Sequence, residues 1–403
     1  METKERVELM RTSLERIAEE CTAFKPKKSP VGLFGGKAGM ALFYAYLYRW
    51  SGNQDHFDQF SLLLDECFAE MGDATMGSSL VGGITGVGWL VRHLVDIELL
   101  EASSLDSLEV IEKYILQSLT RDRETKRFEI FRGIAGKGLY FLEGPMTTAG
   151  QEGIEQILSI LQSGAIPGDG GIAWTTKSWR GDELYYDLGI PHGVTGIILF
   201  LCRVSRTNIQ RDLVLELIDG AVRWVLAKEQ HMGIGYFPHI VNREFAGRLA
   251  WCYGDMGVAA ALLEAAEVLS LPPLREKAIM VLDKEAGRDL GSARVFKHPR
   301  YNIYDRGLCH GTTGIALFFN SFYKKTGIDS LRTARDYWTD ITLSIKKTGM
   351  GRGIGGYIFP SLANKDIWQK NPYVLDGTGG VGLSYLSLLN EDQLPWERIF
   401  LLR

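Results

Sequence analysis

Residues 311–319 have the sequence GTTGIALFF, in which two glycines three positions apart are followed directly by an apolar run. The same arrangement occurs six more times, at intervals of 47 to 66 residues. The first glycines of the seven pairs are Gly36, Gly83, Gly133, Gly193, Gly254, Gly311 and Gly377. Self-similarity at intervals of this order indicates a protein built from repeated structural units, each large enough to hold two helices.

The run that follows each glycine pair is apolar at nearly every position, which is typical of a helix buried on all sides. Amphipathic stretches lie between these runs: Leu108, Ile111, Ile115 and Leu119 mark one face at helical spacing. Similar stretches cover residues 151–161, 211–227 and 329–346. The pattern predicts an all-α chain with one inner and one outer helix in each repeat.

Seven such helix pairs can close into an α/α toroid, in which seven inner helices form a barrel and seven outer helices cover it. An open solenoid is the alternative, but it would need polar capping repeats, and the first and last repeats are as apolar as the others. We predict a single domain over residues 1–403. We expect the first glycine of each pair to adopt a positive φ where a loop turns into the helix, and the second to let inner helices approach closely.

The charge pattern excludes several classes of partner. The chain has 403 residues, 45% of them hydrophobic and 23% charged, with a net charge of −4 and no run of lysines or arginines. Nothing in it favours nucleic acid or an anionic membrane surface. The longest strongly apolar stretch, residues 194–204, is too short to span a bilayer, and the polar first twenty residues lack the apolar core of a signal peptide. We expect a cytoplasmic protein.

The five cysteines are odd in number and far apart, which favours reduced thiols over a disulfide framework. Cys21, Cys67 and Cys202 lie in helical runs, where a cysteine commonly acts as a small buried apolar side chain. Cys252 and Cys309 instead stand two positions before the first glycine of consecutive repeats. If the repeats are equivalent in space, these two cysteines meet at adjacent loops.

The residues directly before each first glycine should also converge at one end of the repeats. They are Gly35, Gly82, Arg132, His192, Tyr253, His310 and Asp376. His310 would then join Cys252 and Cys309 in a set of three nitrogen and sulfur ligands, which suits a catalytic Zn²⁺ with an open fourth position. Because two thiolates already neutralise Zn²⁺, a substrate thiolate bound there would stay electron-rich and nucleophilic.

These residues resemble the lanthionine synthetase C-like (LanC-like) family of peptide cyclases. The resemblance covers the seven glycine pairs and is sharpest at Trp251-Cys252-Tyr253-Gly254, Cys309-His310-Gly311 and Pro191-His192-Gly193. It implies an α/α toroid in which Cys252, Cys309 and His310 hold Zn²⁺. The implied activity belongs to lanthipeptide (lantibiotic) biosynthesis: Michael-type addition of a peptide cysteine thiolate to dehydroalanine or dehydrobutyrine, closing (methyl)lanthionine rings.

The resemblance also suggests catalytic residues. His192 is the candidate general acid, because a histidine transfers protons near neutral pH and the addition leaves an enolate that must be protonated. Arg248 and Tyr253 match active-site positions of the family and would stabilise the enolate or orient the substrate. Glu129 stands where these cyclases commonly carry aspartate, and could orient His192 or relay a proton. The other histidines carry no motif and are interpreted as structural or surface residues: His56, His93, His231, His239 and His298.

Glycine-aromatic loops at residues 170–174, 233–239 and 353–360 are expected to shape the substrate mouth. The G-x-G-x-x-G pattern at residues 351–356 is not followed by a helix, so we reject dinucleotide binding.

The implied partners are a dehydrated ribosomal precursor peptide as substrate, together with a dehydratase and an exporter that would hold the chain at the membrane as part of a biosynthetic complex. Two other functions remain open from the sequence. The same chemistry could add glutathione to dehydroamino acids in damaged proteins, or the helices could form a non-catalytic binding scaffold with the thiols packed inside.

Overall fold

The computed structural model describes residues 1–25, 29–71, 76–177, 181, 183–230, 234–243, 247–344, 353–361 and 363–402. In chain order its helices are α1 (Thr3–Ala23), α2 (Lys37–Ser51), α3 (Gln54–Glu70), α4 (Ile84–Asp96), the 3₁₀ helix η1 (Ala102–Leu108), α5 (Glu109–Glu124), α6 (Ile134–Phe141), α7 (Thr148–Gly164), α8 (Val194–Val204), η2 (Ser205–Thr207), α9 (Arg211–Leu226), α10 (Gly254–Val268), α11 (Pro272–Ala286), α12 (Leu290–Ala293), α13 (Thr312–Thr326), α14 (Asp329–Leu343), α15 (Thr378–Leu389) and η3 (Pro395–Phe400). None of these helices is long and apolar enough to cross a membrane.

The strands are few and short. Three antiparallel pairs join β1 (Ile166–Gly168) to β2 (Gly171–Ala173), β3 (Thr176–Lys177) to β4 (Leu184–Tyr185), and β5 (Phe359–Pro360) to β6 (Trp368–Gln369). They are hairpins within loops, so the described chain is held together by helix packing, as an all-α protein is.

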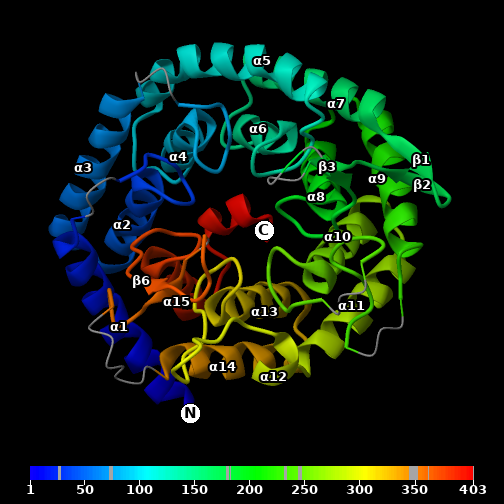
Figure 1. The fold of residues 1–403 in the computed structure, drawn as a ribbon. Helices are drawn as coiled ribbons and strands as arrows, with labels where there is room; N and C mark the ends of the chain where they lie inside the picture. Colours follow the sequence, from blue (N-terminus) through cyan, green and yellow to red (C-terminus); the bar gives the residue numbers. More distant parts are fainter. Residues whose placement is uncertain are drawn as a thin grey trace. The chain divides into compact units, whose positions relative to one another are not determined.

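The chain divides into two compact units. The first unit contains Met1–Met76 and Ala286–Glu397, and the second contains Gly77–Glu285 and Arg398–Leu402. Helices α1 to α3 and α12 to α15 belong to the first unit, and helices α4 to α10 belong to the second, together with almost all of α11 (Figure 1).

Each of the seven glycine pairs begins a helix, as the sequence pattern predicts. These Gly-pair helices are α2, α4, α6, α8, α10, α13 and α15. Every residue of α6 is buried, and so is every residue of α8 except Arg203, which explains why their sequences are apolar on all sides. A helix covered in this way gains stability from every face it removes from water.

Amphipathic partner helices pack against the Gly-pair helices within each unit. In the second unit α7 packs on α6 and α9 packs on α8, and in the first unit α3 packs on α2 and α14 on α13. The predicted stretches 151–161 and 211–227 fall within or one residue beyond α7 and α9, whereas the end of the stretch 329–346 lies outside the described residues.

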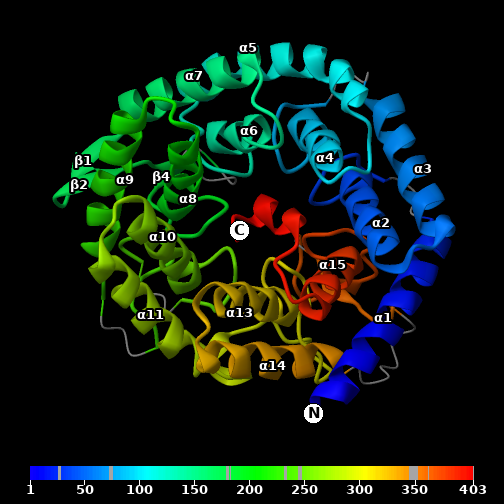
Figure 2. The ribbon, with the colours of Figure 1, turned by 180° about the vertical axis from the view of Figure 1, so that it is seen from behind.

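The last Gly-pair helix has an unexpected partner. Within the described residues only η3 follows α15, and α15 is covered by α1, from the other end of the sequence. Figure 1 and Figure 2 show α1 beside α15 in the first unit. The seventh helix pair therefore joins the first helix of the chain to the last Gly-pair helix.

The expected reason for the first glycine is wrong at most repeats. The first glycine is the N-cap residue of six Gly-pair helices, with an extended φ between −158° and −101°. Among the first glycines a positive φ occurs only at Gly254, where it is 37°. Glycine is needed elsewhere because a Cβ would collide with the backbone of the preceding loop, for example with the Asp187 carbonyl at Gly193.

The second glycine meets the loop before its own helix in several repeats, whereas Gly257 lies against the Thr195 side chain of the neighbouring Gly-pair helix α8. A Cβ on Gly136 would collide with the carbonyl of Ile130, and one on Gly196 with the carbonyl of Ile190, each six residues earlier in the chain. The glycine pair therefore lets each loop fold back tightly against the first turn of its own helix.

The six residues before each first glycine form a repeated loop, which we call the pre-helix loop, with positions counted backwards from that glycine. In six repeats the amide that follows the first glycine donates to the carbonyl at position −6, as Val194 does to Asp187 at 3.0 Å and Thr312 to Asp305 at 3.0 Å. Position −2 is bonded to its neighbour: the amide of Phe131 donates to the carbonyl of Pro191.

This second bond recurs inside each unit, between consecutive repeats and between the seventh repeat and the first. Its donor amide and acceptor carbonyl both belong to position −2, from Val81 to Phe131 in the second unit and from Cys309 to Leu375 and Leu375 to Phe34 in the first. Donor and acceptor are 2.8 to 3.1 Å apart in these three bonds. Side chains at positions −1 and −2 are thus held by a fixed backbone rather than by a mobile loop.

Candidate active site

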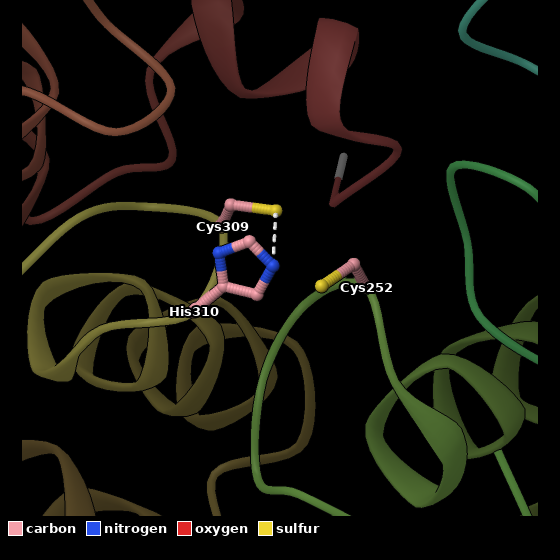
Figure 3. A group of neighbouring side chains, drawn as sticks. All are labelled: Cys252, Cys309 and His310. Atoms are coloured by element: carbon pink, nitrogen blue, oxygen red, sulfur yellow. Dashed lines mark hydrogen bonds between the residues drawn. The ribbon is translucent and has the colours of Figure 1, made fainter. Parts of the chain in front are cut away.

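Cys309 and His310 lie at positions −2 and −1 of the pre-helix loop before α13. The Cys309 amide donates to the Leu375 carbonyl, and the Cys309 side chain is buried, with 5% of the residue exposed. Cys309 Sγ lies 3.6 Å from His310 Nε2, which Figure 3 marks with a dashed line. His310 Nδ1 lies 3.4 Å from Asp376 Oδ1, so the imidazole stands between a thiol and a carboxylate.

The charges around His310 favour a positive group at this position. Burial lowers the pKa of His310, but the Cys309 thiolate and the Asp376 carboxylate outweigh it and raise the pKa to about 10. Histidine ligands of metals usually donate their second nitrogen to a carboxylate in this way. Asp376 stands at position −1 of the seventh repeat, but the sequence pattern does not pair it with His310.

Cys252 occupies position −2 of the pre-helix loop before α10, in the second unit. It is also buried, with 6% exposed, and Tyr253 is the N-cap residue of α10. Gly189 lies so close that a Cβ there would collide with the Cys252 carbonyl. Trp251 Nε1 donates to the Phe400 carbonyl at 3.0 Å, which fixes the residue before Cys252.

Cys252, Cys309 and His310 form the one group of side chains, among the residues that the structure describes, whose ligand atoms could hold a metal ion. Figure 3 draws the three side chains. Each offers one donor atom, a sulfur or a ring nitrogen. Two thiolates and an imidazole suit Zn²⁺ better than Mg²⁺ or Ca²⁺, which prefer oxygen ligands. The chemistry of the donor set therefore fits the predicted metal.

Glu129 and His192 are neighbours in the second unit, as the sequence analysis proposed. His192 Nδ1 lies 3.3 Å from Glu129 Oε2, and the edge of the His192 ring rests on Phe131, with ring centroids 5.1 Å apart. Both oxygens of Glu129 also accept backbone hydrogen bonds, from Phe131 at 2.7 Å and Arg132 at 2.8 Å. Glu129 thus caps its own loop while it orients the histidine.

Electrostatics favour the protonated form of His192. Burial lowers the pKa of His192, whereas Glu129 and the more distant Asp187 carboxylate raise it, and the net pKa is raised. Its side chain is 42% exposed, unlike Glu129 at 10%. A histidine held through Nδ1 and half-exposed can deliver a proton from Nε2 to a bound molecule.

Arg248 and Tyr253, the other two predicted catalytic residues, are in contact. The Arg248 guanidinium carbon lies 5.4 Å from the centre of the Tyr253 ring. The ring of His239 is closer still, with centroids 4.0 Å apart, and His239 Nε2 lies 3.6 Å from Asp187 Oδ2. His239, which the sequence pattern places among the structural or surface histidines, thus lies beside the predicted residue Tyr253, and Asp187, which is not among the predicted site residues, lies beside His239.

Asp187 has a sequence signal, which is its position within the repeat. It stands at position −6, where Asp305 and Asn371 stand in later repeats, and each accepts a bond from the amide two residues on. Asp187 is buried and its pKa is raised to about 7 by burial and by Glu129, against the lowering effects of His192 and the Gly189 amide. Counting back six positions instead of two would have pointed to it.

The remaining histidines of the described chain have local contacts. His93 is buried, stacks on Trp89 with centroids 4.6 Å apart and lies 2.7 Å from Glu143. His56 shares a hydrogen bond with Ser51 at 2.9 Å, and His298 lies under Trp368. His231 lies outside the described residues.

The aromatic loops contribute to the core more than the sequence suggested. Trp174 is 1% exposed and donates to the Leu161 carbonyl, and Tyr357 is fully buried against Tyr385. Tyr236, in the loop at residues 233–239, is half-buried. Gly233 of that loop and residues 351–352 of the glycine-rich pattern lie outside the described residues. The proposed role of these loops as a substrate mouth therefore falls on Tyr236 and its neighbours.

A model of the family described as lanthionine synthetase C-like protein matches residues 28–401. This chain belongs to that family, as its Cys and Cys-His motifs predicted. The solved structure of nisin cyclase is similar over 97% of this chain and 97% of its own, with a TM-score of 0.73 and 17% identity. This similarity confirms the predicted fold class, all-α with the α/α toroid fold. A family 88 glycosyl hydrolase from Bacteroides vulgatus aligns over 98% of this chain and 99% of its own at 11% identity, with a TM-score of 0.44 that supports no argument.

Proposed function

We propose that this chain is a lanthipeptide cyclase, which joins cysteine thiols of a dehydrated precursor peptide to dehydroalanine or dehydrobutyrine residues. Membership of the lanthionine synthetase C-like family is the observation that carries the proposal. The similarity to nisin cyclase supports it through the fold. His192, which is half-exposed and paired with the Glu129 carboxylate, supplies an acid that can protonate the product of the addition.

The proposal includes a zinc site made by Cys252, Cys309 and His310. In each unit, position −2 of one repeat is bonded to position −2 of a following repeat, as Cys309 is to Leu375 and Val81 to Phe131, and Cys252 and Cys309 occupy this position in consecutive repeats. By repeat equivalence the two thiols are therefore expected to be neighbours. Bound zinc would lower the pKa of the substrate thiol and keep it as a thiolate at neutral pH.

Side chains of this protein would stabilise the negative charge of the enolate and donate the proton that the α-carbon takes up. The substrate sulfur forms a bond to the β-carbon, the C=C electron pair moves onto the adjacent carbonyl oxygen as an enolate, and the α-carbon then takes up one proton. His192 Nε2 would donate that proton, while Glu129 holds Nδ1 and compensates the imidazolium charge. Arg248 and Tyr253, in contact with each other, would stabilise the enolate.

The chemistry places the chain after a dehydration step, since dehydroalanine and dehydrobutyrine arise from serine and threonine by loss of water. A dehydratase would therefore supply the substrate and an exporter would remove the product. We include both as proposed partners. We also propose that the chain works in the cytoplasm, where thiols stay reduced. Its five cysteines are free in the structure, which is consistent with that location.

The deciding experiment compares the purified chain with its Cys309→Ala variant on a dehydrated, cysteine-containing peptide. Ring closure leaves the peptide mass unchanged but removes thiols, so alkylation followed by mass spectrometry counts the rings. We expect stoichiometric zinc and full loss of alkylation in the unmodified chain, and loss of both zinc and ring formation in Cys309→Ala. Cys21→Ala, a buried cysteine of the same unit on α1, is the matched control and should keep both.

Other outcomes separate the alternatives. Rings formed by Cys309→Ala without metal would rule out the proposed zinc site. Mass gain of one glutathione per dehydroamino acid, with peptide thiols untouched, would establish the glutathione-adding function instead. A chain with no zinc and no reaction under either condition would favour a binding scaffold.

A further inference from the structure

The segment that carries His239 is fixed by its backbone. The Leu188 amide donates to the His239 carbonyl at 2.9 Å, and the Val241 amide donates to the Tyr186 carbonyl at 3.0 Å. Asp187 forms an antiparallel bridge with Ile240 between these two bonds. The segment is thereby attached to the pre-helix loop that leads to His192.

A buried carboxylate on α10 holds the other end of the same segment. Asp255 is 2% exposed, and its Oδ1 accepts from the amides of Tyr236 at 3.0 Å and Phe237 at 2.9 Å. Because main-chain bonds fix both ends, the path of the segment does not depend on the side chain of His239. A change in that side chain is therefore expected to act locally.

The side chain of His239 joins a buried acid to a proposed catalytic residue. Its Nε2 lies 3.6 Å from Asp187 Oδ2, and its ring centre lies 4.0 Å from that of Tyr253. The Asp187 carboxylate is itself oriented by the Gly189 amide, at 2.6 Å. Tyr253 also contacts the Arg248 guanidinium, so its ring is placed by two side chains, both from the connection between α9 and α10.

We propose that His239, held by Asp187, is a positioning residue that fixes the ring of Tyr253 at the proposed active site. The inference rests on the proposed cyclase function and deepens it, by adding a carboxylate–histidine pair that acts through Tyr253. A tyrosine side chain rotates about two torsion angles. Contacts with its ring restrict both angles, so the ring is already oriented before the substrate binds.

The kinetic test is a double-mutant cycle between His239→Asn and Tyr253→Phe. If His239 acts by placing the Tyr253 hydroxyl, His239→Asn should lower kcat by about tenfold with KM changed less than about twofold. In the Tyr253→Phe background the same change should have almost no further effect. Asp187→Asn should lower kcat in the same way as His239→Asn. The control is His56→Asn, in α3 of the first unit, which should have the kcat and KM of the unmodified chain.

Equal losses of kcat from His239→Asn in both backgrounds, or no loss in either, would overturn the inference while leaving the cyclase function intact. A second readout does not need activity. In a chain with isotope-labelled tyrosine, the Tyr253 ring resonance is identified by its loss in Tyr253→Phe. It should shift in both His239→Asn and Asp187→Asn. A resonance that moves no more than in His56→Asn would contradict the inference, even if the chain proves to catalyse another reaction.

Discussion

At the scale of single residues, Glu129 combines a structural and an electrostatic contact. Its two oxygens accept the amides of Phe131 and Arg132, and Oε2 also lies beside His192. One carboxylate therefore contacts its own loop and the histidine of the neighbouring repeat together.

This double contact predicts the pH dependence of the proposed reaction. Because Glu129 helps to raise the pKa of His192, the protonated acid persists to higher pH than in an ordinary histidine. In Glu129→Gln the alkaline limb of kcat/KM should move to lower pH by about one unit or more. Glu183→Gln, an exposed carboxylate that pairs with Arg243, is the control and should leave the profile in place. An unchanged alkaline limb in Glu129→Gln would show that another group is the acid.

The same contact has a consequence for stability. The pKa of His192 is raised in the folded chain, so the contact with Glu129 stabilises the fold below the unfolded-state pKa. This contribution disappears as the pH rises through the folded-state pKa. The exposure of His192 keeps the contribution small.

At the scale of the element, the glycine pair and its pre-helix loop form one rigid corner. Second glycines such as Gly136, Gly196 and Gly314 have no room for a methyl group, because the carbonyl six residues earlier occupies that space. Gly196→Ala should therefore lower the free energy of unfolding by about 1–3 kcal/mol. Gly82→Ala, in a pre-helix loop of the same unit, meets nothing within 4 Å and should change it by less than about 0.5 kcal/mol.

Urea denaturation of the two variants measures both values. Equal stability of Gly196→Ala and Gly82→Ala would mean that the pre-helix loop shifts to accommodate a methyl group at little cost, and would contradict the proposed rigidity of the glycine pair and its loop.

The sequence predicted the elements well where the signal was local. Seven apolar runs identify the Gly-pair helices, because a helix buried on every side has few polar residues. The expected positive φ of the first glycines is wrong except at Gly254, since backbone approach within a loop leaves no mark in the sequence that distinguishes it from a positive φ. The sequence pattern also missed the pairing of α1 with α15, which depends on contacts between distant parts of the chain.

The candidate site was predictable where its residues occupy equivalent positions in successive repeats. Counting one and two positions back selected His192, Cys252, Cys309 and His310. His239 lies outside that count, and its place beside Tyr253 follows from the bridge between Asp187 and Ile240. A pairing of two irregular segments of this kind has no short sequence signature.

At the scale of the whole molecule, the prediction of a single domain over residues 1–403 stays a prediction. Within the described residues, which end at Leu402, the chain passes between the two units at residues 76–77, 285–286 and 397–398, so neither unit is a continuous segment. Adjacent residues anchor each side of the last passage: Glu397 accepts from Ser321 in the first unit, and Arg398 pairs with Glu143 in the second.

We therefore expect one cooperative thermal transition, with equal calorimetric and van't Hoff enthalpies. Two resolved peaks in a calorimetric scan would contradict the prediction and identify the units as separate domains. Arg398→Ala weakens the last anchor and should lower the temperature of the single transition without splitting it.

The pairing of α1 with α15 also sets the order in which the chain can be completed during synthesis. The ribosome releases α1 first, yet α15, on which it packs most extensively, begins only at Thr378. Until then the apolar side chains that α1 buries against α15 face solvent, a chaperone or a wrong partner, and the contact they finally make has a very large sequence separation. Nascent chains stalled before residue 378 should therefore be protease-sensitive at their first helix, even with six Gly-pair helices already made.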